Sequence, residues 1–294
     1  MNYIFNLYTL FTILFISFHV GYPLNQLSFS GGGSFGAVEI GILKYLMHHN
    51  PKQFNLYTGI SAGALNAGVL SYYSNINEGI KKAEDIYSSI NTRMIYKPFP
   101  LTGRSLVNTK PLFNTLSSII ETMPNQPIIP TLIGATNLYS GKMDVYSFEE
   151  QNDIDKVSLL MSSSAIPCMF PPVDFNHQLY ADGSTLSNEL IQVAHDSNYL
   201  NITFITPYDD LEYDYTPIMT LKDMLCRTIK IIINNYNNPI ACINENCKIP
   251  IGEINKYYVP SKVLRGYHIL NFDKCEKLIQ IGYENVLHKK YDIC

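Results

Sequence analysis

The chain has 294 residues, of which 46% are hydrophobic and 16% charged, a balance that excludes a disordered protein and suits one large globular domain or two small ones. Its net charge of −4, with no long basic run, gives no electrostatic reason to expect a nucleic-acid partner.

The chain begins with a hydrophobic stretch. Residues 1–22 carry no acidic or basic side chain apart from His19, and residues 4–20 are mostly apolar. As a helix, residues 4–20 would be roughly 25 Å long, which is short for a membrane span and long for a signal-peptide core. The sequence predicts a signal peptide or membrane anchor over residues 1–22, and hence a membrane-associated or secretory protein. A membrane-surface helix, or a buried helix in a cytoplasmic protein, is the alternative.

Strand-like and helix-like segments alternate after this leader. Residues 27–30 read as a strand, and apolar residues at helical spacing follow from Val38 to His49. A second strand at 55–58 precedes a helix over about 62–73. Two such alternations within fifty residues predict an α/β fold with a parallel sheet.

The remaining elements are less regular. We expect helices over 80–90, 111–123, 155–165 and 275–290, a hairpin over 128–148 that turns at 139–141, and a strand over 201–206. Residues 207–265 are harder to place. Within them, residues 220–235 form an amphipathic pattern with basic residues, which fits either a core-facing helix or a membrane-facing one.

Ser61 lies between Gly59 and Gly63, where the second strand meets its helix. This G-x-S-x-G pattern is typical of a nucleophile elbow, a sharp turn that exposes a serine hydroxyl at the N-terminus of a helix. A turn or helix-capping serine between two glycines is the alternative interpretation.

A second glycine-rich segment, Gly31-Gly32-Gly33-Ser34-Phe35-Gly36, follows the first strand. A dinucleotide-binding loop would need an acidic residue about 20 positions later, at the end of the second strand. Glu39 is the only acidic residue between 37 and 60, and it lies in the first helix. An oxyanion hole made of backbone N–H groups is therefore the better interpretation.

A nucleophilic serine needs a base. None of the seven histidines lies in a recognisable motif, whereas Asp182 ends an apolar segment and is followed at once by a glycine. A partly dry site would raise the pKa of this carboxyl group toward neutral pH, so that it could accept the serine proton. A tight Asp-Gly turn is the alternative.

Six cysteines leave the redox state open. They are Cys168, Cys226, Cys242, Cys247, Cys275 and Cys294. They could pair behind a secretory leader or remain reduced in a cytosolic protein. Because no CxxC pair or His-x₃-His spacing accompanies them, no metal site is expected.

Taken together, the motifs resemble those of the patatin-like phospholipases. GxSxG follows GGGxxG by 28 residues, counted from Gly33 to Ser61, and Asp-Gly follows the serine by 121. SSSAIPCMFPPV resembles the Ser-x-Ala-x-Pro segment of that family, and IGYENVLH its closing helix. The resemblance covers residues 24–206, within a catalytic domain expected over 24–294 whose part from 207 onward is less certain.

This resemblance implies a three-layer α/β/α sandwich with a mostly parallel central sheet and a Ser–Asp dyad. Ser61 would be the nucleophile and Asp182 the base. Gly31, Gly32 and Gly33 would supply oxyanion donors, and Gly36 would let the loop turn. The reaction would be the hydrolysis of acyl esters, of the phospholipase A or lysophospholipase type, through an acyl-enzyme. Its substrates would be membrane lipids or lipid aggregates, and no cofactor is implied.

Three positions depart from the family pattern. Ala37 replaces the usual Arg or Lys after the glycine loop, and Ser184 replaces the second small residue of Asp-Gly-Gly/Ala. Cys168 replaces another small residue, either near the acyl pocket or as a buried spectator. The departures leave open a non-catalytic lipid-binding protein. The sequence is also compatible with an α/β-hydrolase whose Ser–His–Asp triad uses His268, and with a membrane-anchored structural protein.

Overall fold

The structure, a computed structural model, describes residues 24–98, 104–124, 126–187, 190, 200–207, 224 and 251–291. The predicted leader over residues 1–22 lies outside the described residues. The same holds for the amphipathic stretch 220–235, apart from residue 224, and for four of the six cysteines (Cys226, Cys242, Cys247 and Cys294).

The described residues form a mixed set of strands and helices in alternation. The strands are β1 (Leu24–Phe29), β2 (Leu56–Ile60), β3 (Lys97–Pro98), β4 (Val107–Asn108), β5 (Thr131–Asn137), β6 (Lys142–Ser147), β7 (Val173–Phe175), β8 (Gln178–Asp182), β9 (Leu200–Ile205), β10 (Ile251–Tyr258) and β11 (Leu287–Tyr291). The α-helices are α2 (Gly36–His49), α3 (Ala62–Leu70), α4 (Ile76–Ser89), α5 (Thr92–Ile95), α6 (Lys110–Glu121), α7 (Asp153–Ser163) and α10 (Cys275–Glu284). The 3₁₀ turns are η1 (Gly33–Phe35), η2 (Gly183–Thr185), η4 (Ser261–Leu264) and η5 (Phe272–Lys274).

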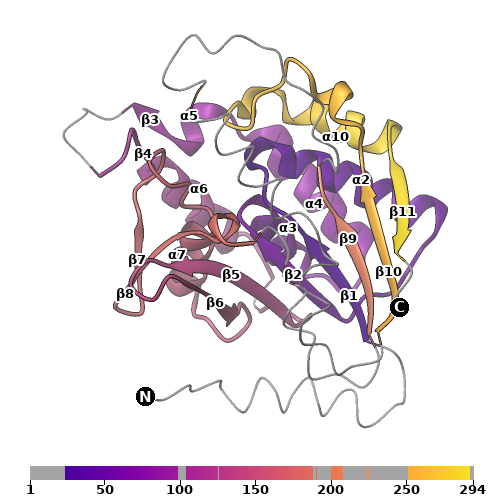
Figure 1. The fold of residues 1–294 in the computed structure, drawn as a ribbon, viewed down its shortest axis with the longest axis horizontal. Coiled ribbons are helices and arrows are strands. Elements are labelled where there is room, and N and C mark those ends of the chain that lie inside the picture. Colours follow the sequence, from indigo (N-terminus) through magenta and orange to yellow (C-terminus); the bar gives the residue numbers. More distant parts are fainter. Residues whose placement is uncertain are drawn as a thin grey trace.

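A central sheet dominates the molecule (Figure 1). Its middle strands, in the order β10-β9-β1-β2-β5, are all parallel, whereas β11 at one edge and β6, β7 and β8 at the other pair antiparallel. The helices that connect β1 to β2 and β2 to β5 are the crossovers that parallel neighbours require. The predicted α/β class and the mostly parallel central sheet are confirmed.

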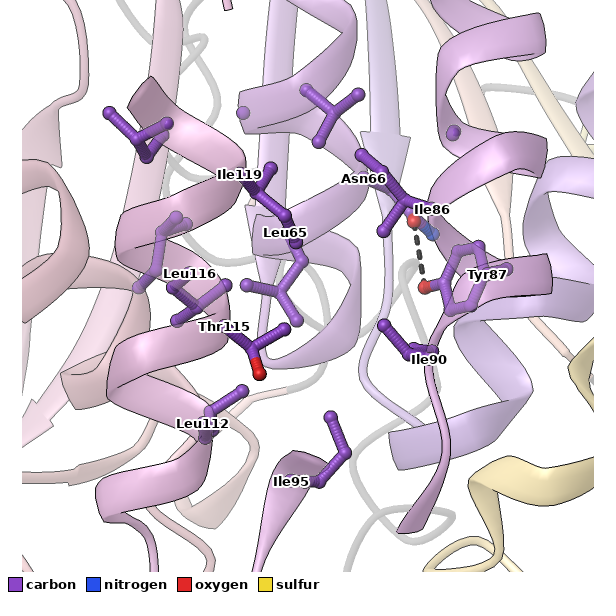
Figure 2. Close-up of a pocket in the computed structure, with 15 residues that line it drawn as sticks. Leu65, Asn66, Ile86, Tyr87, Ile90, Ile95, Leu112, Thr115, Leu116 and Ile119 are labelled. Atoms are coloured by element: carbon purple, nitrogen blue, oxygen red, sulfur yellow. Dashed lines mark hydrogen bonds between the residues drawn. The ribbon is translucent and has the colours of Figure 1, made fainter. Parts of the chain in front are cut away.

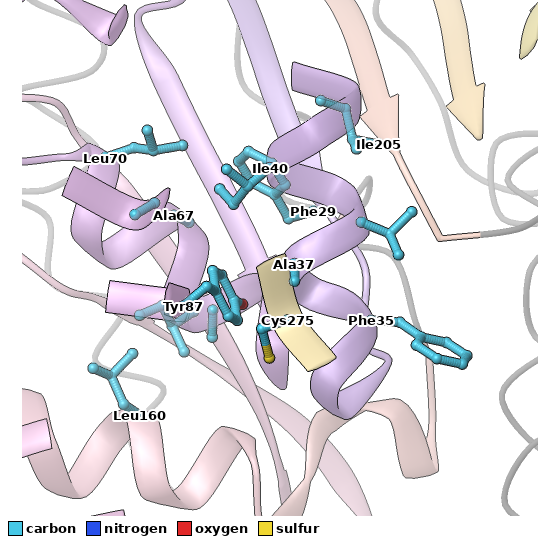
Figure 3. Packing of buried hydrophobic residues seen from close by; sticks show 14 of the residues in the cluster. Phe29, Phe35, Ala37, Ile40, Ala67, Leu70, Tyr87, Leu160, Ile205 and Cys275 are labelled. Atoms are coloured by element: carbon cyan, nitrogen blue, oxygen red, sulfur yellow. The ribbon is translucent and has the colours of Figure 1, made fainter. Parts of the chain in front are cut away.

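The two faces of the sheet bury different side chains, because successive residues of a strand point to opposite sides. Leu27 and Phe29 of β1 belong to the main core, to which all seven described α-helices contribute. Figure 3 shows part of this core, with Phe29 among side chains from α2, α3, α4, α7 and α10. Leu24 belongs instead to a small cluster on the other face, made only of strand residues.

The prediction of a closing helix over 275–290 is wrong at its end. The helix α10 stops at Glu284, and Leu287–Tyr291 forms β11, which pairs antiparallel with β10. Its partner β10 lies in the stretch 207–265, for which the sequence predicts no strand. Helical periodicity describes local sequence only, whereas an edge strand such as β10 offers unpaired backbone groups that recruit the following segment.

The predicted hairpin is confirmed, because β5 and β6 pair antiparallel up to Asn137 and Lys142.

No helix in the described part of the chain is long and apolar enough to cross a membrane. Of the two cysteines that the structure describes, Cys275 is a buried free thiol. Cys168 is a free, exposed thiol, so the expectation of a buried spectator at that position is wrong.

Candidate active site

Ser61 forms a sharp turn between β2 and α3. Its φ is 55° and its ψ is −123°, a conformation that costs free energy for a residue with a side chain. A side chain on Gly59 would collide with the carbonyl of Gly63, and one on Gly63 would collide with the carbonyls of Phe29 and Ser30. The two glycines therefore let the elbow pack directly against the end of β1.

Ser61 and Asp182 meet because the C-terminal ends of β2 and β8 face each other along one edge of β5. The strand β6 pairs with residues 132–137 of β5, so β2 and β8 must share the opposite edge. There Ile60 pairs with Gly134, and Asp182 pairs with the next residue, Ala135. The residue that follows β2 is consequently adjacent to the last residue of β8, although 121 positions separate them in sequence.

The two side chains are in direct contact. Ser61 Oγ donates a hydrogen bond of 2.7 Å to Asp182 Oδ2. Ser184 donates to the other carboxylate oxygen, Oδ1, through its hydroxyl at 2.6 Å and its backbone N–H at 2.9 Å. Ser61 is 4% exposed and Asp182 is 1% exposed, so this hydrogen-bond set lies in a nearly dry environment.

Burial controls the charge of Asp182. Desolvation raises the pKa of its carboxyl group to about 6, and the hydrogen bonds from Ser184 and Ser61 oppose part of that rise. The carboxylate is therefore mostly ionised at neutral pH, yet basic enough to accept a proton from a reacting hydroxyl.

Ser163 is a structural part of the site to which the sequence motifs assign no role. Its hydroxyl accepts a hydrogen bond of 2.9 Å from the backbone N–H of Ser61 and donates one of 2.7 Å to the carbonyl of Gly134. It thereby ties the strained elbow to β5. The signal that could have found it is its place as the serine of the Ser-x-Ala-x-Pro segment.

The glycine-rich loop runs from β1 into α2, beside the elbow. Gly33 has φ 58°, and a side chain there would collide with the carbonyl of Ile269. Ser34 anchors the loop, since its N–H donates to Ile269 at 2.7 Å and its hydroxyl donates to the carbonyl of His268 at 3.0 Å. A side chain on Gly36 would crowd Ala62, the residue after Ser61.

The backbone N–H groups of this loop differ in availability. Those of Gly32 and Gly33 donate to no acceptor among the described residues. The N–H of Gly36 donates to the carbonyls of Gly33 and Ser34, within the turn. Gly32 and Gly33 are thus the better candidates for oxyanion donors, and Gly36 serves the turn.

A buried carboxyl group lies behind the loop. Glu39 Oε1 accepts hydrogen bonds from the N–H and the hydroxyl of Ser30, both at 3.0 Å, and Oε2 accepts one from Asn66 at 2.9 Å. Asn66 also donates to the carbonyl of Gly36 and accepts from the Tyr87 hydroxyl. Burial raises the pKa of Glu39 well above that of an ordinary glutamate. This network joins β1, α2, α3 and α4.

The described residues do not form the Ser–His–Asp triad that would use His268. At 2.7 Å, Ser61 Oγ and Asp182 Oδ2 leave no room for an imidazole ring between them. The ring of His268 accepts instead from the backbone N–H of Leu270. Within the described ranges, no group of three or more His, Cys, Asp or Glu side chains is arranged to hold a metal ion.

An apolar cavity lies between α3, α4, α5 and α6 (Figure 2). Leucine and isoleucine side chains dominate its lining, and Asn66, Tyr87 and Thr115 supply its polar atoms. It encloses about 50 Å³, room for only a few water molecules. Neither Ser61 nor Asp182 lines it, so the cavity is separate from the dyad.

A family model described as "Patatin-like phospholipase" matches residues 27–195 of this chain. A curated relative, "Probable lipid hydrolase 463L" of Invertebrate iridescent virus 6, is 26% identical over 193 residues, which cover 56% of this chain and 61% of the relative. The match therefore leaves more than a third of that relative uncovered.

Two solved structures are similar at a lower level. VipD from Legionella pneumophila has a TM-score of 0.43 at 13% identity, over 92% of this chain and 68% of VipD. The type III effector protein ExoU has a TM-score of 0.31 at 12% identity, over 92% of this chain and 55% of ExoU.

Proposed function

The chain belongs to the patatin-like phospholipase family, whose model matches more than half of its 294 residues, and we propose that it hydrolyses acyl esters of lipids through Ser61 and Asp182. The observation that carries the proposal is the hydrogen bond of 2.7 Å between Ser61 Oγ and Asp182 Oδ2, made at a strained elbow. The available N–H groups of Gly32 and Gly33 and the pKa of Asp182 support it.

The first half of the reaction forms an acyl-enzyme. Ser61 Oγ attacks the ester carbonyl carbon while its proton passes to Asp182 Oδ2. The N–H groups of Gly32 and Gly33 donate to the oxygen that becomes negative in the tetrahedral intermediate. The intermediate collapses with breakage of the ester C–O bond, and the proton from Asp182 goes to the departing alcohol.

The second half releases the fatty acid. Asp182 takes a proton from a water molecule, whose oxygen attacks the acyl carbon, and a second tetrahedral intermediate forms at the same oxyanion donors. Its collapse returns the proton to Ser61 Oγ. In both halves the proton moves between Asp182 and the reacting oxygen atoms.

The proposal also covers the class of substrate and the cellular setting. Acyl esters of phospholipids or lysophospholipids, presented in a membrane or aggregate, are the substrates. Residues 1–22, through their apolar character, would hold the protein at a lipid surface in a membrane-associated or secretory setting.

The test compares the purified chain with its Ser61→Ala variant. A fluorophosphonate probe should label the wild-type serine and not the variant. Fatty-acid release from mixed phospholipid vesicles should fall by roughly a thousandfold or more in the variant. Failure to label Ser61 in the folded wild-type protein would favour the non-catalytic lipid-binding alternative.

A further inference from the structure

The Asp182 carboxylate accepts hydrogen bonds from two serine hydroxyls, that of Ser61 and that of Ser184. The hydroxyl of Ser61 donates to Oδ2, and the hydroxyl and N–H of Ser184 both donate to Oδ1. Ser184 is 6% exposed and lies in η2, the short turn that Asp182 itself caps. Each carboxylate oxygen therefore has its own hydroxyl donor at 2.6–2.7 Å.

The Ser184 hydroxyl is a second donor to Oδ1, in addition to the backbone N–H. A glycine or an alanine at this position would supply the N–H alone. A buried carboxylate that lacks donors is strongly disfavoured in its charged form, and a short hydroxyl donor offsets part of that penalty. Donors fixed on Oδ1 also fix the carboxylate plane, and with it the direction in which Oδ2 faces Ser61.

We propose that Ser184 is a positioning residue that keeps the Asp182 carboxylate ionised and turned toward Ser61, so that the base works within a Ser61–Asp182–Ser184 set. The hydrogen-bonding role follows from the geometry alone. Its catalytic consequence rests on the proposed function.

The neighbours of Asp182 leave few other groups that could control its charge. Ala135 and Thr136 of β5 pack beside it, and the Thr136 hydroxyl donates to its backbone carbonyl at 2.9 Å. Ala165, after α7, accepts its backbone N–H at 2.8 Å. On β8 itself, the Tyr180 hydroxyl donates to Asp144, across β5.

Asp144 is the nearest charged group by strand register among the described residues. It pairs with Ala135 from the far side, two strand spacings away from Asp182, which is roughly 10 Å. The elbow and the described residues of η2 contribute no charged side chain. Ser184 and Ser61 are the side chains that donate hydrogen bonds to the carboxylate within the described part of the site.

The experiment follows the titration of Asp182 directly, by ¹³Cγ NMR of the full chain, with the signal assigned through Asp182→Asn. Ser184→Ala should move the Asp182 midpoint upward by about one pH unit. Ser184→Thr, which keeps the hydroxyl, should stay near the wild-type midpoint. Thr185→Val is the matched control, because the buried Thr185 hydroxyl in the same turn has no partner among the described residues.

The kinetic counterpart is the acid limb of kcat/KM with a soluble ester. In Ser184→Ala this limb should shift upward by the same amount, which is a roughly tenfold loss of rate at a pH well below the midpoint. Equal midpoints in wild type and Ser184→Ala, or equal shifts in Ser184→Ala and Thr185→Val, would overturn the proposal. A wild-type protein without esterase activity would refute the proposed function, and the NMR titration would still decide the role of Ser184.

Discussion

At the scale of single residues, the site combines a strained backbone with a buried charge. Ser61 holds φ 55° at the elbow, and Asp182 is buried with a pKa of about 6. Both features are unfavourable for stability by themselves and are typical of residues retained for chemistry. The donors around Asp182 decide whether its carboxylate is available as a base at neutral pH.

The first prediction concerns the pH dependence of hydrolysis. Because Asp182 must be ionised to accept the serine proton, and burial raises its pKa to about 6, kcat/KM should fall below about pH 6 by about tenfold per unit. Rates with a soluble ester between about pH 4.5 and 8 measure this limb. An acid limb that persists unchanged in Asp182→Asn would assign it to another group.

The second prediction concerns His268. Its ring bonds to the backbone of Leu270 and not to the dyad, so His268→Gln should keep kcat/KM within about threefold of wild type. Steady-state kinetics on the folded variant measure this. A loss comparable to that of Ser61→Ala, with the melting temperature preserved, would instead support a triad.

At the scale of secondary-structure elements, a polar network joins the segments that carry the site. Glu39 in the first turn of α2 bonds to Ser30 at the end of β1 and to Asn66 in α3, and Asn66 bonds to Tyr87 in α4. The glycine loop lies between β1 and α2, and the elbow begins α3. The network therefore fixes the loop relative to Ser61.

The third prediction is that Glu39 makes stability depend on pH. Its pKa is raised in the folded state above the value of 4.5, so its protonated form stabilises the fold fully below about pH 4.5, and this contribution is lost as the pH rises through the folded pKa. Glu39→Gln removes the titrating group. The free energy of unfolding of wild type should therefore fall relative to that of the variant as the pH rises above 4.5, as urea unfolding at a series of pH values would measure.

Tyr87→Phe is the control for this series. It removes the hydroxyl that donates to Asn66 Oδ1 without removing a group that titrates in this range. Its cost, about 1 kcal/mol, should be the same at every pH. A difference for Glu39→Gln that is equally flat would contradict the assignment to Glu39.

At the scale of the whole molecule, the C-terminal part supports the N-terminal glycine loop. The carbonyls of His268 and Ile269 hold Ser34, and α10 lies against α2. Two glycines permit this packing: a side chain on Gly41 would collide with the carbonyl of Ile279, and one on Gly282 would collide with the carbonyl of Val38. Figure 3 shows Cys275 of α10 beside Ala37 and Tyr87 in the same core.

The fourth prediction tests this packing through Gly282→Ala. In an ordinary helix the change would stabilise by up to about 1 kcal/mol. Here the new methyl group meets the backbone of Val38, so we expect destabilisation by about 1–3 kcal/mol, measured by urea unfolding. Lys277→Ala, at an exposed position of the same helix, should change stability by less than about 0.5 kcal/mol. A Gly282→Ala protein more stable than wild type would show that α10 does not press on α2 in this way.

Sequence alone determined the parts of this protein that depend on local pattern. The alternation of strands and helices predicted the α/β class, and the hairpin over 128–148 followed from its turn residues. The order of GGGSFG, GISAG and ADGS led to Ser61 and Asp182, because an elbow and a glycine loop require glycines at fixed positions that can be read directly from the sequence. Local pattern failed at Leu287–Tyr291, whose strand depends on a partner in β10.

The tertiary structure decided which residues meet. The shared edge of β5 places Asp182 against Ser61. Hydrogen bonds made in the folded chain bring Ser163 to the elbow and Ser184 to the Asp182 carboxylate. The packing of α10 against α2 shows why Gly41 and Gly282 have no side chain. These contacts join residues far apart in the chain or depend on side-chain direction, and a single sequence specifies neither. Hydrogen bonding and burial in three dimensions therefore set the charge of Asp182, which no motif encodes.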